Sequence, residues 1–193
     1  MAYPRLVVSV KPSTGPRIVG SRGLWDDSLM STRPYFAIGT LVPVAALVFA
    51  YLLQYVGGLD PCPLCIFQRI AMAGVALCCL MGWIHGGGAI ASRIYAALAT
   101  LCALTGAAIA ARHVWLMHLP PDQVPACGPG LDYLVQIMPL SDVVATVLRG
   151  DASCATVKGS FAGLTLPAWT LICFVGLTLG GLWGVSRSPA RSD

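Results

Sequence analysis

Residues 35–56 read YFAIGTLVPVAALVFAYLLQYV, a run of 22 residues without a charged side chain. A hydrocarbon core of about 30 Å is crossed by roughly 20 helical residues, because each residue of a helix rises by about 1.5 Å. The other structure that spans a bilayer is a closed barrel, whose strands alternate apolar and polar residues, and this run does not alternate. The stretch therefore predicts a transmembrane helix.

Three further stretches are long and mainly apolar, namely residues 66–84, interrupted by Gln68 and Arg69, residues 94–117, which include Arg112 and His113 near their end, and residues 167–185. The chain of 193 residues is 56% hydrophobic and 10% charged, whereas a soluble domain has about 25% charged residues. Its mean hydropathy is +0.75. This composition excludes a soluble enzyme, a disordered chain and a nucleic-acid-binding protein. The sequence predicts an all-α membrane protein, a four-transmembrane-helix bundle with a long loop between the third and fourth helices.

The positive charges predict the orientation of the bundle. Lys and Arg residues near membrane spans are retained on the cytoplasmic side. Eight of the 12 lie in the two tails or in the short connection 85–93, namely Arg5, Lys11, Arg17, Arg22, Arg33, Arg93, Arg187 and Arg191. Two others, Arg149 and Lys158, lie in the long loop. We therefore expect both termini in the cytoplasm and the connections 57–65 and 118–166 on the opposite side.

A single domain is expected, covering residues 34–186. It is flanked by an N-terminal tail of residues 1–33 and a C-terminal tail of residues 187–193. The N-terminal tail lacks the compact apolar segment that precedes the cleavage site of a signal peptide. We therefore expect the first helix, residues 35–56, to serve as an uncleaved anchor.

One short helix is expected inside the long loop, after Pro139. Its apolar side chains recur at helical spacing and form one stripe, namely Leu140, Val143, Val144, Val147 and Leu148. Ser141 is a candidate for its N-terminal cap. Such a stripe either lies in the membrane interface or packs against the bundle, and both placements are open.

The eight cysteines divide by their depth in the membrane. Four lie inside the spanning runs, where an apolar surround disfavours the thiolate, and these are expected to be inert: Cys78, Cys79, Cys102 and Cys173. The other four lie in the two outer connections. Cys62 and Cys65 form a Cys-Pro-Leu-Cys motif, and Cys127 and Cys154 belong to the long loop. That side of the membrane is the oxidising one, where disulfides persist.

Three interpretations compete for the four outer cysteines. Two structural disulfides are the simplest, and the pairing 62–65 with 127–154 is one of three pairings. A zinc site is disfavoured because Cys127 and Cys154 are 27 residues apart, unlike the ligands of a closed Cys₄ site, and no His is near them in the sequence. We therefore predict no metal site. The third interpretation is disulfide exchange.

The position of Cys65 favours disulfide exchange. It begins the second helix, where the helix dipole favours a thiolate, and Arg69 lies one turn deeper on the same face. Arg69 either snorkels to the membrane surface or stabilises negative charge on the sulfur and on a quinone oxygen. His113 is either a second donor at this level or an interfacial histidine. Exchange alone only moves oxidation between cysteines, and no flavin, haem or nucleotide motif is present, so a lipid-soluble electron acceptor is predicted.

Several segments together resemble a known family. They are DPCPLCIFQR at 60–69, RHVWL at 112–116, CGPGLDYL at 127–134, CA at 154–155 and GLTLPAW at 163–169. In order and spacing they are similar to the DsbB family of bacterial inner-membrane thiol:quinone oxidoreductases, which form disulfide bonds. The resemblance implies a four-helix bundle with ubiquinone, or menaquinone, bound near the outer leaflet. Asp151-Ala-Ser-Cys154 departs from the Gly-Glu-Cys often found in the family, and the N-terminal tail is longer.

The resemblance also implies roles for the site residues. Cys62 and Cys65 form the pair next to the quinone, with Cys65 in a thiolate–quinone charge-transfer contact. Cys127 and Cys154 form the shuttle pair, in which Cys127 makes the mixed disulfide with a DsbA-like periplasmic thiol oxidase. Transient pairing of Cys62 with Cys154 relays the electrons inward. Two further residues match positions near the family's quinone site, Arg69 and His113.

We therefore expect an enzyme that reoxidises a DsbA-like partner and passes the electrons to the respiratory quinone pool. It would support electron transport and protein folding in the periplasm, with no nucleic-acid partner. One alternative is an enzyme similar to vitamin K epoxide reductase, which also places a C-x-x-C beside a quinone. The long loop and its CGPGLDYL stretch argue against it. The other alternative is a non-catalytic membrane scaffold stapled by disulfides, or a metal-binding carrier.

Overall fold

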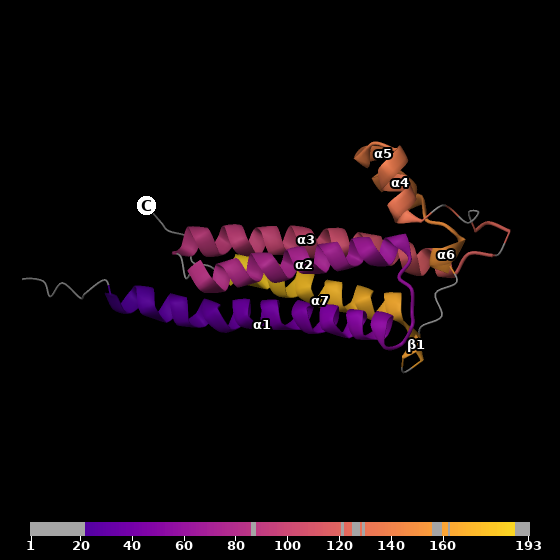
Figure 1. The fold of residues 1–193 in the computed structure, drawn as a ribbon. Helices are drawn as coiled ribbons and strands as arrows, with labels where there is room; N and C mark the ends of the chain where they lie inside the picture. Colours follow the sequence, from indigo (N-terminus) through magenta and orange to yellow (C-terminus); the bar gives the residue numbers. More distant parts are fainter. Residues whose placement is uncertain are drawn as a thin grey trace, which may run out of the picture.

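The computed structural model describes residues 22–85, 88–120, 122–124, 128, 130–155, 160–161 and 163–187. Within them, four long helices run side by side (Figure 1): α1 Arg22–Tyr55, α2 Pro63–His85, α3 Ala89–Met117 and α7 Leu166–Arg187. Each of the four includes a stretch long and apolar enough to cross a membrane. The prediction of an all-α, four-helix membrane protein is confirmed.

The long helices begin earlier than the sequence predicted. Helix α2 begins at Pro63 instead of residue 66, because the missing N–H of a proline costs nothing in the first turn. Helix α3 begins at Ala89 instead of residue 94, and α1 begins at Arg22, within the segment expected to be a tail. The remainder of the two tails, residues 1–21 and 188–193, lies outside the described residues.

Helix α3 is central to the bundle, because it packs against both α2 and α7, while α1 packs mainly against α2. The core between them includes Met72, Val75 and Phe174, all buried. Gly106 lets α3 approach α7 closely, since a Cβ at this position would lie 2.2 Å from the Phe174 ring. The outward faces carry exposed apolar side chains such as Leu101, which suits a hydrocarbon surround.

Shorter elements lie between α3 and α7. They are α4 Leu131–Ile137, α5 Leu140–Arg149, α6 Ala152–Ala155 and an antiparallel pair of strands, β1 Ser160–Phe161 and β2 Leu164–Thr165. Figure 1 shows them gathered at one end of the bundle, where α2 and α7 begin and α3 ends. The chain therefore concentrates its irregular structure at a single end.

Helix α5 is the short helix that the apolar stripe predicted, but its cap differs. Pro139 is at the N-cap with an extended backbone, and no side chain caps the helix, so Ser141 lies inside the first turn. Val143 and Val147 are buried in a second apolar cluster, which contains Leu64, Leu116, Leu134, Ile109, Cys62 and Cys154. Leu140 is 72% exposed. Part of the apolar stripe thus packs against the bundle, which was one of the two placements that the sequence left open.

Arg112 ties the end of α5 to α3. Its guanidinium donates hydrogen bonds to the carbonyl oxygens of Leu148 and Arg149, at 3.2 and 3.1 Å, and lies 4.2 Å from the ring centroid of Trp115. These carbonyls end a helix and lack partners within it, so a cation is favourable there. The tether fixes the segment that leads directly into α6.

Candidate active site

Cys62 and Cys65 lie at the start of α2, where the helix geometry brings their sulfur atoms together. The carbonyl oxygen of Cys62 accepts a hydrogen bond from the Ile66 N–H at 3.2 Å, as in a first helical turn. The Cys62 sulfur accepts one from the Cys65 N–H at 3.4 Å, in the manner of a capping side chain. The two sulfur atoms are 3.2 Å apart. One helical turn is therefore enough to place both thiols in contact.

Cys154 reaches the same place from α6. Its N–H bonds to the carbonyl and the carboxylate of Asp151, at 3.1 and 3.2 Å, and its side chain is buried. The Cys62 thiol hydrogen-bonds to the Cys154 sulfur, and this contact, with help from the Leu64 N–H, lowers the pKa of Cys154 to about 7. The same contact raises the pKa of Cys62. Cys62 therefore lies between two sulfur partners.

His113 of α3 completes the cluster and is fully buried. Its Nε2 is 3.0 Å from the carbonyl oxygen of Cys154 and 3.8 Å from the Cys62 sulfur. Its Nδ1 is 3.2 Å from the amide nitrogen of Gln68 and 4.0 Å from the Cys65 sulfur. Because a carbonyl oxygen only accepts, Nε2 carries the proton and Nδ1 accepts from Gln68.

The structure brings Cys62, Cys65, Cys154 and His113 together, whereas Cys127 lies outside the described residues. The seven cysteines within the described part of the chain are all free thiols. Gln68 was missed by the sequence analysis, although it is buried and touches His113. Its signal was an uncharged amide inside an apolar run, one turn after Cys65.

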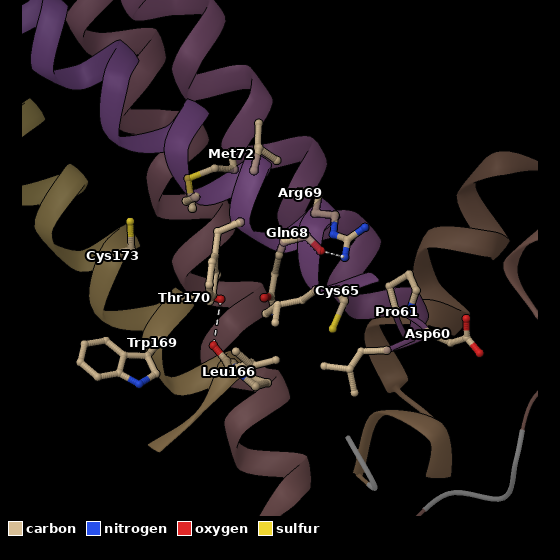
Figure 2. Close-up of a pocket in the computed structure, with 17 residues that line it drawn as sticks. Asp60, Pro61, Cys65, Gln68, Arg69, Met72, Leu166, Trp169, Thr170 and Cys173 are labelled. Atoms are coloured by element: carbon tan, nitrogen blue, oxygen red, sulfur yellow. Dashed lines mark hydrogen bonds between the residues drawn. The ribbon is translucent and has the colours of Figure 1, made fainter. Parts of the chain in front are cut away.

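A cavity of about 210 Å³ adjoins Cys65. Figure 2 shows that α2 contributes Cys65, Gln68 and Arg69 to the lining, and that α7 contributes Trp169 and Thr170. Most of the lining is apolar and includes Leu47, Phe49, Leu53, Met72, Leu166 and Pro167. Cys173, expected to be an inert membrane cysteine, also lines the cavity. Cys65 therefore lines a largely apolar cavity whose described lining also includes the charged residues Arg69 and Asp60.

Contacts with α1 hold Arg69 in place. Its guanidinium donates to the side-chain oxygen of Gln54 and, at 3.2 Å, to the carbonyl oxygen of Ala50. It also lies 4.9 Å from the ring centroid of Tyr51. These contacts fix the charge at the cavity wall, on the same helix face as Cys65.

Comparison with known proteins assigns the family. The model of the family described as disulfide bond formation protein DsbB matches residues 32–184. The chain belongs to the DsbB family. It is 50% identical to Disulfide bond formation protein B of Methylococcus capsulatus over 163 residues, which is 83% of this chain and 99% of the relative. It is 47% identical to the protein of that name from Chromohalobacter salexigens over 151 residues, 78% of this chain and 88% of the relative.

Membership of the DsbB family gives the chain a role in disulfide bond formation within a membrane. The matched stretch includes every residue of the site described above. A role in disulfide bond formation agrees with the cluster of Cys62, Cys65 and Cys154 around His113.

Proposed function

We propose that this DsbB-family protein is a thiol:quinone oxidoreductase. It reoxidises a DsbA-like periplasmic thiol oxidase by disulfide exchange and passes the electrons to a membrane quinone, ubiquinone or menaquinone. The observation that carries the proposal is the chain of contacts from Cys154 to Cys62 to Cys65, which ends at a cavity containing Arg69. Family membership favours this function over a vitamin K epoxide reductase-like enzyme or a stapled scaffold.

The cavity fits the ring of a quinone. An apolar cavity of about 150 Å³ takes up benzene, so about 210 Å³ is enough for a substituted ring. Leu47, Met72 and Trp169 offer apolar contacts to such a ring, and Arg69 offers a cation to its oxygen. When bound, the quinone supplies the acceptor for two electrons and two protons. Cys65 is the member of the Cys62–Cys65 pair that lines this cavity.

The exchange between the two cysteine pairs balances in thiols and disulfides. The partner's dithiol reduces the Cys127–Cys154 disulfide and leaves as a disulfide. The Cys154 thiolate then attacks the Cys62 sulfur of the Cys62–Cys65 disulfide, which forms a Cys62–Cys154 bond and releases Cys65 as a thiolate. Cys127 attacks Cys154, restores the shuttle disulfide and releases Cys62. Cys62 and Cys65 then hold the two electrons for the quinone.

The local structure supports this order. Within the described part of the chain, Cys62 interacts with both Cys154 and Cys65, so it suits attack by the first and release of the second. The released Cys65 thiolate lies at the N-terminus of α2, where the helix dipole favours an anion. His113 bonds the carbonyl of Cys154 and so holds α6 against α2 and α3.

The same proposal includes the place of the site in the cell. Arg93 lies near the start of α3 and His113 of the site near its end, and Arg33 begins the span of α1, so these two cations lie toward the end of the bundle away from the site. We assign the site end to the periplasm of a bacterial inner membrane and both termini to the cytoplasm. Residues 34–186 then form the catalytic domain, with the tails outside it.

Quinone reduction by the purified protein tests the proposed function. Reduced DsbA and a short-chain ubiquinone are mixed with the chain, and the loss of quinone absorbance is followed. Cys65→Ser should abolish DsbA-dependent reduction, whereas Cys78→Ser, the same change deep in α2, should leave the rate near that of the unaltered protein. Menaquinone is tested in parallel to identify the acceptor. Unchanged turnover in Cys65→Ser would show that the proposal is wrong.

A further inference from the structure

The reduced site has the donor set of a metal centre as well as that of a redox relay. The sequence predicted no metal site, because no His is near Cys127 or Cys154 in the chain. The fold changes this premise, since α3 brings His113 to Cys62 and Cys65. One ligand atom from each of these three residues lies within 4.8 Å of the other two. We propose that the reduced protein binds one thiophilic divalent cation, Zn²⁺, through Cys62, Cys65 and His113.

The distances fit tetrahedral coordination. Zn–S bonds of about 2.3 Å and Zn–N bonds of about 2.0–2.1 Å place neighbouring ligand atoms roughly 3.5–3.8 Å apart. Here the two sulfur atoms are 3.2 Å apart, and the Cys65 sulfur is 4.0 Å from Nδ1 of His113. These two distances need to change by about half an ångström, and the Cys62 sulfur, which lies 3.8 Å from Nε2, must also move toward Nδ1 to seat the ion. Two thiolates and an imidazole are the soft ligand set that Zn²⁺ prefers.

The surroundings of His113 resemble those of a metal ligand. Ligating histidines usually donate the N–H of their other ring nitrogen to a carbonyl or carboxylate, which fixes the ring. Nε2 of His113 already makes such a bond to the Cys154 carbonyl, at 3.0 Å. Nδ1 then carries the lone pair and is the ligand atom, and the ion displaces the amide of Gln68 from it. Both His113 and Cys62 are buried, which protects the bonds from water.

Binding depends on the redox state of the site. Coordination releases two protons, one from each thiol, and changes no oxidation state. A Cys62–Cys65 disulfide offers no thiolate, so the oxidised protein loses the site. Three protein ligands leave the fourth position of a tetrahedral site open. The ion occupies both sulfur atoms that the proposed function needs, so it inhibits turnover, and this inhibition rests on that proposed function.

Binding of Co²⁺ to the purified full-length protein tests the site without reference to activity. The protein is reduced, freed of reductant and metal under argon, and titrated with Co²⁺, whose tetrahedral thiolate complexes absorb strongly in visible light. We expect one tetrahedral Co²⁺ per reduced chain, displaced by Zn²⁺, and no such spectrum after oxidation with diamide. Loss of an outer contact alone weakens a metal site about 10- to 100-fold, so Cys62→Ser or Cys65→Ser should weaken binding at least 100-fold.

Matched variants locate the ion. Cys78→Ser removes a thiol deep in α2 and should leave the spectrum unchanged. Cys154→Ser should retain tetrahedral binding, which separates this site from the Cys127–Cys154 pair. Equal spectra for reduced and oxidised protein, or for Cys62→Ser and the unaltered chain, would overturn the inference. So would loss of binding in Cys154→Ser with retention in Cys62→Ser.

The activity assay separates the two proposals. Zn²⁺ should slow quinone reduction by reduced DsbA, and a chelator should restore the rate. Full turnover at a Zn²⁺ concentration that saturates the reduced site would contradict the inhibition. Turnover without any tetrahedral Co²⁺ would refute the metal site and leave the proposed function standing. A tetrahedral Co²⁺ spectrum in a protein that reduces no quinone would support the metal site and refute the proposed function.

Discussion

At the scale of single residues, the contact between Cys62 and Cys154 controls which sulfur is the nucleophile. The Cys62 thiol donates, so Cys154 is the thiolate of the two, with its pKa lowered to about 7. Its thiolate is therefore present above about pH 7 and is lost as the pH falls below that value. This pKa belongs to the fully reduced site, because Cys62 has no proton to donate once it is in a disulfide. In that reduced state, reaction of Cys154 with an alkylating reagent requires the thiolate and is faster on the alkaline side of pH 7.

This difference predicts a pH profile for Cys154. In the reduced protein, kept free of metal by a chelator, the rate of alkylation of Cys154 should rise with pH and have its midpoint near pH 7. Mass spectrometry of the peptide that contains Cys154 measures this rate. Cys62→Ala removes the donor and should move the midpoint upward, toward the ordinary thiol value of about 8.5. Cys78→Ser, away from the site, should leave it in place. One and the same midpoint in the Cys62→Ala variant and the unaltered protein would contradict the assigned hydrogen bond.

Arg69 gives a second prediction at this scale. A hydrogen bond to a charged group contributes about 1.5–3 kcal/mol, so Arg69→Ala should raise the KM for quinone about 10- to 100-fold. Exchange between the cysteine pairs should continue, because the guanidinium of Arg69 bonds to Gln54 and Ala50 of α1 rather than to a cysteine of the relay. Steady-state assays at varied quinone concentration measure the effect, with Arg93→Ala at the far end of α3 as the control. A KM unchanged in Arg69→Ala would return this residue to the snorkelling interpretation.

At the scale of elements, the turn between α5 and α6 determines where Cys154 lies. Gly150 has a φ of +78°, a conformation that side chains disfavour, and a Cβ there would lie 2.2 Å from a methyl carbon of Leu116. Arg112 holds the carbonyls that precede this turn. The position of Cys154 against Cys62 thus depends on a turn that admits only glycine.

Gly150→Ala should therefore damage both stability and relay. Backbone strain of this kind costs about 1–3 kcal/mol, and relief of the clash would displace α6. Thermal unfolding of the reduced protein should occur at a lower temperature, and the yield of the Cys62–Cys154 disulfide in a Cys65→Ser, Cys127→Ser background should fall. Gly130→Ala is the matched control, because a Cβ there meets nothing within 4 Å. Equal yields in the two glycine variants would refute the role of this turn.

The elements also show what the sequence could predict. The number of spanning helices could be predicted, because each apolar run is long enough to cross the hydrocarbon core of a bilayer. The proximity of Cys62 and Cys65 could also be predicted, because residues three apart lie about one helical turn from each other. The contact between Gln68 and His113 could not be predicted, because it joins residues 45 positions apart on different helices. This contact depends on how α2 is rotated about its own axis relative to α3. Successive residues of a helix are about 100° apart around that axis, so the face that meets α3 cannot be assigned from the sequence to within one residue. The sequence placed the start of α2 at residue 66, and the structure places it at Pro63.

At the scale of the whole molecule, the bundle separates two kinds of surface. Its outward faces are apolar and suit lipid, whereas the thiols of Cys62 and Cys154 lie buried at one end and the half-buried Cys65 lines a cavity between helices. Disulfide exchange with a water-soluble partner and electron transfer to a lipid-soluble acceptor can therefore occur side by side. The resemblance, rather than residue spacing, supplied the order in which the cysteines act.

The most direct test of this account is a single turnover started from the fully reduced protein. The chain is mixed anaerobically with quinone, quenched at intervals by an alkylating reagent, and its disulfides are identified by mass spectrometry. The account predicts that Cys62–Cys65 forms first, with one quinol per disulfide, followed by a transient Cys62–Cys154 bond and then Cys127–Cys154. Appearance of Cys127–Cys154 before any Cys62–Cys65 disulfide, or quinol formed with all four thiols intact, would contradict it.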